Sequence, residues 1–505
     1  MHKIMNFKKN GHIWLLLLIF TAVFASRLIF AFQSPFFSLD DSYYVLRQVE
    51  EIDESGKPLI YDDLSYQGRF HSEIPLYYYI LGFFNLFLPA WVIGKIIPNL
   101  FASLLIFIIY LISYDLTKKK DLSLFGALLS GFVPLFYSKT FNSLSFSNLM
   151  LPLMFLLIYF TIKNKPKNTI IAFVILSILA CMISPVSSLL VAGYLMFILL
   201  VKLNKKKLSR NRFEMIVFYC SAFIFVHIVF FQRSLREYGY KIFWQNIPTQ
   251  MLESYFSEIT LIGGIMGVGI IAALFGGYVI YRYVASSKNE KILMLVGFAI
   301  STTFLIWLRL VEPAIGLMYI SVTMVVFFIL FIKEMPQIIG ETKFDKFKYL
   351  IGFAIAISFL LSFFIPSFAY SQTELKEVPE KNDVNSLING KEKVPEGDTI
   401  LGRLSEGNMI SFYTGRKNFV DTRFLLAPEP EKRLDIEEDI YTSNFETAVV
   451  RSMVENNLDF VFVSDKTRKI YDENLFKFSE SECFEEVNSR LYKLTCKIRS
   501  VKKNE

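Results

Sequence analysis

Long runs of apolar residues recur along most of this chain and set the first limit on its fold. A bilayer core of roughly 30 Å needs about 20 apolar residues per helix, so each such run counts as one crossing. Of 505 residues, 53% are hydrophobic and 16% aromatic, and the mean hydropathy is +0.42. We therefore predict a mainly α-helical, polytopic membrane protein.

Clusters of lysine and arginine separate the apolar runs and predict the topology. Cationic loops are retained in the cytoplasm, so an even number of crossings should separate successive clusters. Paired runs meet this condition, and Ser184 with Pro185 divides one run that is too long for a single helix. The clusters span residues 118–120, 163–167, 202–212, 282–291 and 333–348.

About eleven crossings result, and residues 1–370 make up the membrane domain. The first crossing reads as an uncleaved helix, since it lacks a clear cleavage site. The run at 75–88 is about 14 residues long, which is typical of an interfacial or re-entrant helix, so residues 33–90 form one external loop. The predicted crossings cover residues 13–32, 91–115, 122–137, 149–162, 169–183, 187–201, 213–231, 260–283, 292–308, 313–332 and 349–369.

Residues 371–505 are polar and are predicted to form a small α/β domain outside the cytoplasm. The net charge of +7 comes from the membrane part, so we attribute it to retained cytoplasmic cations and exclude nucleic acid as a partner. The N-terminus should lie in the cytoplasm, and we expect the plasma membrane as the location. Residues 378–395 read as a linker and 444–457 as a helix. Strand-like pieces occur at 399–401, 409–413, 418–420, 460–463 and 491–496.

The four cysteines divide into two kinds. Cys181 and Cys220 lie in apolar runs, whereas Cys483 and Cys496 lie in the polar tail. The stretch 490–496 alternates with the period of a strand, so a hairpin bridged by a disulfide between Cys483 and Cys496 is geometrically reasonable. Two free thiols are the alternative.

Two adjacent carboxylates, Asp40 and Asp41, follow the first crossing within a few residues. One of them is expected to cap the helix at 42–52, because aspartate satisfies free backbone amides at a helix start. The other is then available as a general base or a cation ligand, at a surface where lipid-borne substrates meet water.

Further ionisable residues border the same side of the predicted membrane. Arg69, His71 and Glu73 precede the interfacial helix, and Lys95 lies one turn into the next helix. These residues are candidates for substrate binding. The alternative is that the histidine is structural and the cations anchor helix ends at lipid headgroups.

Arg309 and Glu312 lie at the predicted external junction of the ninth and tenth crossings. An ion pair between the two is one interpretation. The other is a substrate contact, for which Arg309 suits a phosphate because its guanidinium offers paired donors to two oxygens.

Several classes of protein are disfavoured. The sequence has no P-loop, dinucleotide fingerprint, HExxH or paired CxxC motif, and its four histidines are scattered. ATP-driven and redox chemistry are therefore not expected. Charges within the crossings are scarce, which argues against an ion-coupled transporter.

The order of these features resembles the GT-C glycosyltransferases that use polyprenyl-phosphate-linked donors. Protein O-mannosyltransferases and aminoarabinose transferases carry an acidic residue after their first helix and a Pro-Leu-Tyr stretch further on. Archaeal oligosaccharyltransferase-like proteins have a segment similar to residues 404–425 after their last helix. The matching positions are Asp40, Asp41, Tyr44, Pro75, Leu76, Tyr77, Gly407, Gly415, Arg416 and Asp421.

The resemblance implies an inverting transfer of one sugar, from a polyprenyl-phosphate donor to a protein, glycan or lipid acceptor on the non-cytoplasmic face. Family logic assigns the base to Asp40, while Asp41 orients the acceptor or a cation. Arg309 and Arg69 would stabilise the leaving phosphate. The other candidate substrate-binding residues are Tyr44, His71, Glu73, Lys95 and Glu312.

The chain departs from oligosaccharyltransferases in one respect. Their second external loop has an acidic pair that helps to hold a divalent cation, whereas here that loop carries Asn142 and Asn148, and a WWD-type signature is missing. A magnesium or manganese ion on Asp40 and Asp41 stays an open alternative, with no cofactor certain. The competing interpretations of function are a lipid-linked solute transporter or flippase, and a non-catalytic scaffold.

Overall fold

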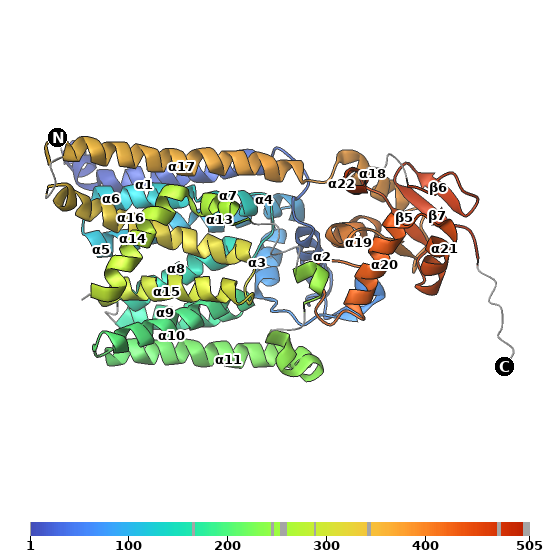
Figure 1. Cartoon of the computed structure of the whole chain (residues 1–505), viewed down its shortest axis with the longest axis horizontal. Helices are drawn as coiled ribbons and strands as arrows, with labels where there is room; N and C mark the ends of the chain where they lie inside the picture. Colours follow the sequence, from blue (N-terminus) through green and yellow to red (C-terminus); the bar gives the residue numbers. More distant parts are fainter. Residues whose placement is uncertain are drawn as a thin grey trace.

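The computed structural model describes residues 2–497 except 164–166, 244–246, 253–259, 287–288, 341–344 and 472–475. Parts of three predicted basic clusters, at 164–166, 287–288 and 341–344, lie outside the described residues. The described helices form an elongated bundle, and a smaller domain that contains a sheet lies at one end of it (Figure 1).

Fourteen helices of the described chain build the bundle. They are α1 (His2–Ala31), α4 (Ala90–Ser103), α5 (Leu105–Thr117), α6 (Lys120–Gly131), α7 (Pro134–Thr140), α8 (Ser147–Lys163), α9 (Lys167–Cys181), α10 (Ser188–Leu203), α11 (Arg210–Tyr238), α13 (Leu261–Val268), α14 (Ile270–Ser286), α15 (Glu290–Trp307), α16 (Pro313–Gly340) and α17 (Lys348–Lys376).

The apolar helices agree with the predicted crossings. Within the described residues, seven helical segments are long and apolar enough to span a membrane, and two bent pairs raise the number to nine. Two shorter apolar helices, α8 and α9, coincide with the remaining predictions at 149–162 and 169–183. The protein is therefore a multi-pass membrane protein with a mainly helical bundle.

Two predicted crossings are bent rather than straight. The helices α6 and α7 meet at 44°, where Pro134 at the start of α7 lacks the amide that would continue the helix. The helices α13 and α14 meet at 83° around Gly269, whose φ is +92°. A Cβ there would lie 2.7 Å from the ring of Phe363, so glycine suits both the turn and the close packing.

Small residues bring the central helices close together. A Cβ at Gly297 of α15 would lie 2.9 Å from the backbone nitrogen of Phe197 in α10, and Gly193 of α10 packs against Phe298. Without a hydrophobic driving force between helices in lipid, such close backbone approach is what supplies packing energy. These glycine contacts fix α10 against α15 within the bundle.

The first loop, residues 32–89, forms a layer between the bundle and the sheet domain (Figure 1). It contains α2 (Asp41–Ser55), β1 (Tyr61–Asp62), the 3₁₀ turn η1 (Ser65–Gln67), β2 (Arg69–Phe70) and α3 (Leu76–Asn85). The predicted interfacial helix is α3, which is too short to cross a bilayer. Leu86 and Phe87 at its end are 68% and 69% exposed, as expected for residues that contact lipid.

The C-terminal domain is α/β and holds a five-stranded sheet of order β4-β3-β5-β7-β6. Strand β3 pairs in parallel with β4 and β5, whereas β7 is antiparallel to β5 and β6. The strands are β3 (Thr399–Leu401), β4 (Lys417–Asn418), β5 (Phe460–Phe462), β6 (Phe484–Asn488) and β7 (Leu491–Leu494). The helices are α18 (Lys381–Gly390), α19 (Gly407–Thr414), α20 (Pro430–Thr442), α21 (Glu446–Glu455) and α22 (Asp465–Tyr471).

Two predictions for this domain are wrong. Residues 409–413 are helical, in α19, because a short apolar run does not by itself distinguish a strand from a buried helix. The predicted linker at 378–395 contains α18, whose Val384 and Leu387 are buried in the core. Both segments owe their structure to packing partners that are distant in the sequence.

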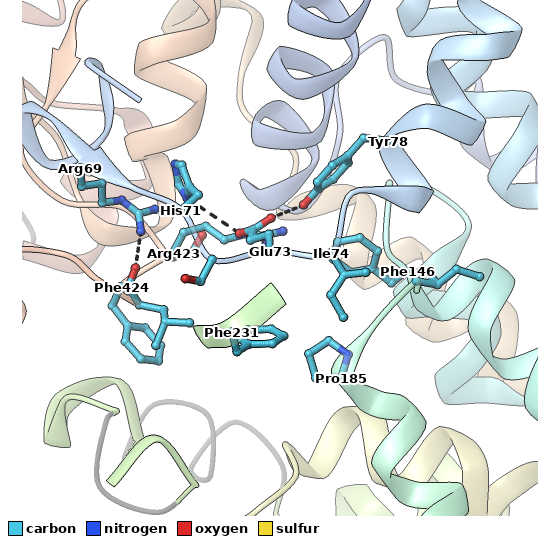
Figure 2. Close-up of a pocket in the computed structure, with 14 residues that line it drawn as sticks. Arg69, His71, Glu73, Ile74, Tyr78, Phe146, Pro185, Phe231, Arg423 and Phe424 are labelled. Carbon is cyan, nitrogen blue, oxygen red and sulfur yellow. Dashed lines mark hydrogen bonds and ion pairs between the residues drawn. The ribbon is translucent and has the colours of Figure 1, made fainter. Parts of the chain in front are cut away.

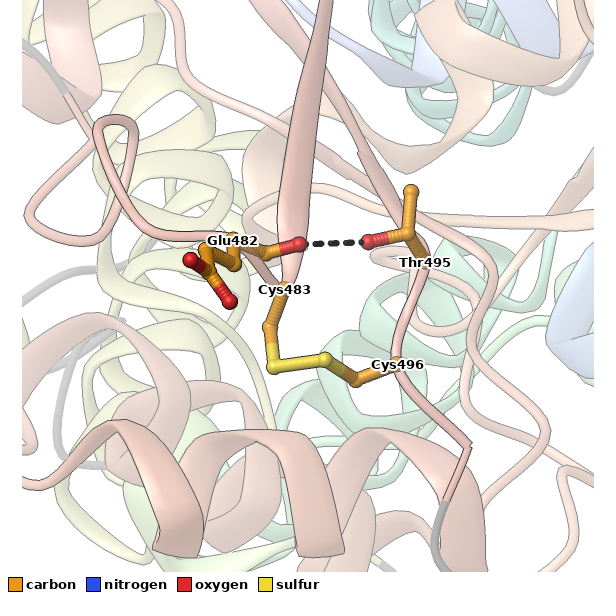
Figure 3. Close-up of a disulfide and its surroundings, with 4 residues drawn as sticks. All are labelled: Glu482, Cys483, Thr495 and Cys496. Atoms are coloured by element: carbon orange, nitrogen blue, oxygen red, sulfur yellow. Dashed lines mark hydrogen bonds between the residues drawn. A yellow bond between two sulfur atoms is a disulfide. The ribbon is translucent and has the colours of Figure 1, made fainter.

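The predicted disulfide is confirmed. Cys483 and Cys496 are bonded, with their Cα atoms 4.7 Å apart, at the open end of the β6–β7 hairpin (Figure 3). The Thr495 hydroxyl donates to the carbonyl of Glu482 across the same ends, at 3.0 Å. The bridge therefore ties the edge strand β6 to its neighbour β7.

We predict that the first loop and the C-terminal domain face the non-cytoplasmic compartment together. Single cysteines replacing Glu54 and Thr447, in a Cys181→Ser, Cys220→Ser background, should react with a membrane-impermeant maleimide in intact cells. Lys207→Cys, in a basic cluster, should react only after permeabilisation. Labelling of positions 54 and 447 on opposite sides would contradict this arrangement, and labelling of both only after permeabilisation would reverse the orientation.

Candidate active site

A cavity of about 210 Å³ lies where the first loop, the bundle and the C-terminal domain meet (Figure 2). One wall is polar and comes from the segment after β2 and from the loop after β4. The opposite wall is apolar and comes from the bundle. The lining residues are Arg69, His71, Ser72, Glu73, Ile74, Tyr78, Phe146, Ile183, Pro185, Phe231, Thr422, Arg423, Phe424 and Leu425.

Three residues predicted from the sequence line this cavity, namely Arg69, His71 and Glu73. Tyr44, a fourth, is buried behind them, with its ring centre 4.9 Å from that of His71. Burial and the nearby Arg69 lower the pKa of His71, so its imidazole is neutral at pH 7. The first loop thus brings its predicted residues together.

Arg423, which the sequence analysis missed, is the central cation of the site. Its Nη1 donates to Glu73 at 2.6 Å, its Nη2 lies 3.5 Å from Asp41, and its guanidinium lies 4.6 Å from the ring centre of Tyr44. Burial opposes its charge, but Asp41 and Glu73 raise the pKa of Arg423 well above its usual value. Only its neighbour Asp421 gave a signal in the sequence, through the resemblance.

Asp41 is the accessible carboxylate of the pair. Its side chain is 47% exposed and faces Arg423. The Thr422 hydroxyl donates a hydrogen bond to its Oδ1. A carboxylate that is partly solvated and held by one hydroxyl and one guanidinium can accept a proton from an incoming group.

Asp40 points the other way, into the C-terminal domain. Its Oδ2 accepts from the backbone nitrogen of Asn408 at 3.1 Å and from the Asn408 amide at 2.8 Å, and its Oδ1 accepts from the backbone nitrogen of Met409 at 2.8 Å. It stands at the N-cap position of α2 but makes no side-chain capping bond there. The expectation that Asp40 or Asp41 caps its own helix is therefore wrong for Asp40, which caps α19 instead.

Burial raises the pKa of Asp40 to about 8, against the opposing effect of the hydrogen bonds from Met409 and Asn408. The carboxyl group is only 9% exposed and is not among the residues that line the cavity. Both Asp40 oxygens accept hydrogen bonds from α19, whereas the Asp41 carboxylate accepts from Thr422 and is partly exposed to solvent.

Buried contacts fasten the first loop to the C-terminal domain. The Ser65 hydroxyl donates to Asp421 at 2.5 Å, and Arg69 donates to the carbonyl of Leu425 at 2.8 Å and lies 3.6 Å from Asp421. The Tyr66 amide donates to the side chain of Asn418 at 2.9 Å. These contacts position Arg69 at the cavity wall, as Figure 2 shows.

Beyond Asp40, Asp41 and Tyr44, three more predicted residues lie outside the cavity lining. Lys95 is buried in α4, where its ammonium donates to the carbonyl of Phe36 at 2.8 Å and to the side chain of Asn142. Arg309 and Glu312 lie in the turn between α15 and α16, with Arg309 at a φ of +56°. A substrate contact by these residues stays a prediction.

The donors present do not fit the divalent cation that the resemblance suggested. The oxygens of Asp40 accept hydrogen bonds from α19, and those of Asp41 face Thr422 and Arg423. The side-chain oxygen of Asn142 already accepts a hydrogen bond from the buried Lys95 amine, which occupies the place a cation would take. In the described part of the chain, no group of three or more His, Cys, Asp and Glu side chains is placed to hold a metal.

The fold has clear relatives among solved structures, although no protein-family model and no curated protein matches the sequence. An Archaeoglobus fulgidus oligosaccharyltransferase, solved with a tethered acceptor peptide, is 12% identical with a TM-score of 0.69, over 93% of this chain and 71% of that one. ArnT from Cupriavidus metallidurans is 11% identical with a TM-score of 0.59, over 96% and 98%. The mycobacterial arabinofuranosyltransferase AftD is 14% identical with a TM-score of 0.51, over 88% of this chain and 35% of that one.

These neighbours define the class of fold. The neighbours match 88% to 96% of this chain in structure, and all of them are GT-C glycosyltransferases. The chain therefore has the GT-C fold, as the resemblance in sequence predicted. Structures of two of these neighbours contain dolichol phosphate and undecaprenyl phosphate, respectively.

We predict that Asp421→Ala loosens the C-terminal domain from the first loop. Removing one partner of a buried ion pair costs about 3–5 kcal/mol, since the other charge is left buried. The melting temperature in detergent should fall accordingly. Asp439→Ala, at an exposed position of α20, is the control and should change stability by no more than about 0.5 kcal/mol. Equal melting temperatures for the two variants would show that these contacts carry no stability.

The raised pKa of Asp40 predicts a pH-dependent stability. A carboxyl group with a pKa of about 8 when folded and 3.8 when unfolded binds an extra proton in the folded state, so its stabilising contribution is lost as pH rises toward 8. The melting temperature of the wild type should therefore fall relative to that of Asp40→Asn between pH 5 and pH 8. Parallel pH curves for the two proteins would contradict the buried, protonated state.

Proposed function

We propose that this protein transfers one sugar from a polyprenyl-phosphate donor to an acceptor hydroxyl on the non-cytoplasmic face of the plasma membrane. The observation that carries the proposal is an accessible carboxylate, Asp41, beside a cavity that has two arginines on one wall and apolar residues on the other. The GT-C fold and the lipid phosphates bound by two structural neighbours support it.

In this proposal Asp41 is the general base. The acceptor oxygen attacks the anomeric carbon as its proton passes to the Asp41 carboxylate, while the bond from that carbon to the phosphate oxygen breaks. The configuration inverts, and the products are the glycosylated acceptor and the polyprenyl phosphate. Thr422 holds the carboxylate and Arg423 balances its charge before the acceptor arrives.

Arg423 and Arg69 are proposed to bind the leaving phosphate. Both line the cavity, and each has a buried nitrogen, Nε of Arg423 and Nη2 of Arg69, that donates no hydrogen bond within the described residues. Donors placed where negative charge grows lower the barrier more than donors that bind the ground state. This assignment replaces Arg309, which the sequence favoured, because Arg309 does not line the cavity.

The apolar wall is proposed to take the first isoprenoid units of the donor. Phe146, Ile183, Pro185 and Phe231 form it, and all four come from the helices of the bundle or the turns between them. A lipid carried in the bilayer would then present its phosphate to Arg423. The acceptor approaches the exposed face of Asp41, and its class, protein, glycan or lipid, is set by the solvent side of the site.

We predict that Asp41→Asn abolishes sugar transfer and leaves the fold intact. Loss of a general base lowers kcat by about 10²–10⁴-fold. The assay incubates purified protein in lipid nanodiscs with radiolabelled polyprenyl-phosphate sugars and follows donor consumption. Glu54→Gln, an exposed carboxylate at the end of α2, is the control and should keep wild-type kcat.

Arg423→Gln should lower kcat as well as donor affinity, because the same guanidinium serves the bound phosphate and the leaving phosphate. A wild type that binds the lipid but consumes none of the sugar donors would favour a flippase or a scaffold. Full activity of Asp41→Asn would remove the base assignment.

A further inference from the structure

The two adjacent aspartates belong to one closed circuit of hydrogen bonds that crosses the domain boundary. Asp40 accepts from the side-chain amide of Asn408 at 2.8 Å, and the same amide donates to the Thr422 hydroxyl at 3.2 Å. Thr422 in turn donates to Asp41. Since Asp40 and Asp41 are joined by a peptide bond, the circuit returns to its start.

Among the described residues of the C-terminal domain, the N-cap residue of α19 provides no side-chain cap. Its N-cap residue, Glu406, makes no side-chain capping bond and instead accepts from Ser464 and Thr467. The first amides of a helix need acceptors, and aspartate oxygens are among the preferred acceptors at a helix start. Asp40, 368 residues away in the sequence, fills the position.

The same helix start is pressed against the segment that carries Thr422 and Arg423. A Cβ at Gly407 would overlap the carbonyl oxygen of Val420 and would lie 2.7 Å from the Cβ of Asp421. Asp421 also accepts from the backbone amide of Arg423 at 2.8 Å. The beginning of α19 and residues 420–423 are therefore one packed unit, and whatever holds α19 also holds Thr422.

We propose that Asp40 is a positioning residue: by capping α19 it docks the C-terminal domain on the first loop, so that Asn408 and Thr422 orient Asp41. The inference rests on the proposed function, since it concerns the orientation of the proposed general base, Asp41. It makes the C-terminal domain part of the active site, because that domain supplies both Thr422 and Arg423. Catalysis then requires a hydrogen-bond acceptor at position 40 but not a negative charge there.

This role separates Asp40 from Asp41 in one experiment. Asparagine at position 40 keeps one acceptor oxygen for the amides of α19, while its NH2 group replaces the other oxygen and faces a backbone N–H. Its neutral side chain resembles the protonated acid favoured by burial. Asp40→Asn should therefore keep kcat within about tenfold of the wild type, while Asp40→Ala should lose about 10²-fold, the cost of misplacing a reacting group. A base at position 40 would instead make Asp40→Asn as inactive as Asp41→Asn.

Thr422 offers a second test that does not disturb the cap. Its hydroxyl donates to the Asp41 carboxylate and holds the orientation of that side chain, so Thr422→Val should lower kcat and leave KM for the donor unchanged. Thr422→Ser restores the hydroxyl and should recover most of kcat. Thr442→Val, the same change at an exposed position of α20, should leave both kcat and KM unchanged.

Measurement of kcat and of KM for the donor gives distinct outcomes. The inference is overturned if Asp40→Asn loses as much activity as Asp41→Asn, or if Thr422→Val keeps the wild-type kcat. Should Asp40→Ala fail to fold, the Asp40→Asn and Thr422→Val results decide the question. Wild-type activity of Asp41→Asn would instead overturn the proposed base and identify that failure separately.

Discussion

The hydrogen bonds between Asp40 and the start of α19 are the constraint on which the rest of the site depends. They join a loop that follows the first helix to a domain that follows the last one. Burying a carboxyl group without hydrogen-bond partners costs free energy, and so does a helix start whose amides lack acceptors. The hydrogen bonds between Asp40 and α19 remove both costs. The pairing thus holds two parts of the chain together that share no sequence neighbourhood.

The charges around the cavity balance only when both parts are present. The first loop supplies the carboxylates of Asp41 and Glu73, and the C-terminal domain supplies the guanidinium of Arg423 between them. Without the C-terminal domain the carboxylates of Asp41 and Glu73 would lack Arg423, and without the first loop Arg423 would lack both carboxylates. The requirement for charge balance therefore favours the docked arrangement, and an anionic phosphate would find two arginines, Arg69 and Arg423, in the cavity wall.

The sequence predicted what is local or periodic and missed what depends on docking. Apolar runs and basic clusters predicted the crossings, and alternation around Leu491 predicted the last strand and its disulfide. The apolar residues of α19 predict a strand, because the cap that begins the helix comes from Asp40 and no local residue indicates a helix start. Arg423 could not be predicted from the sequence for the same reason, because its partners Asp41 and Glu73 lie at the other end of the chain.

The segment that carries the aspartates is also held from the membrane side. Lys95 donates to the carbonyl of Phe36, the Asn142 amide donates to that carbonyl at 3.2 Å, and the backbone of Ser38 donates to Asn142 at 3.2 Å. The two hydrogen bonds of the buried Lys95 amine, to a carbonyl and to an amide oxygen, fix the position of this segment. The segment between α1 and α2 is thus fixed below by Lys95 and Asn142 and above by α19, which leaves Asp41 as the carboxylate of the pair that faces solvent.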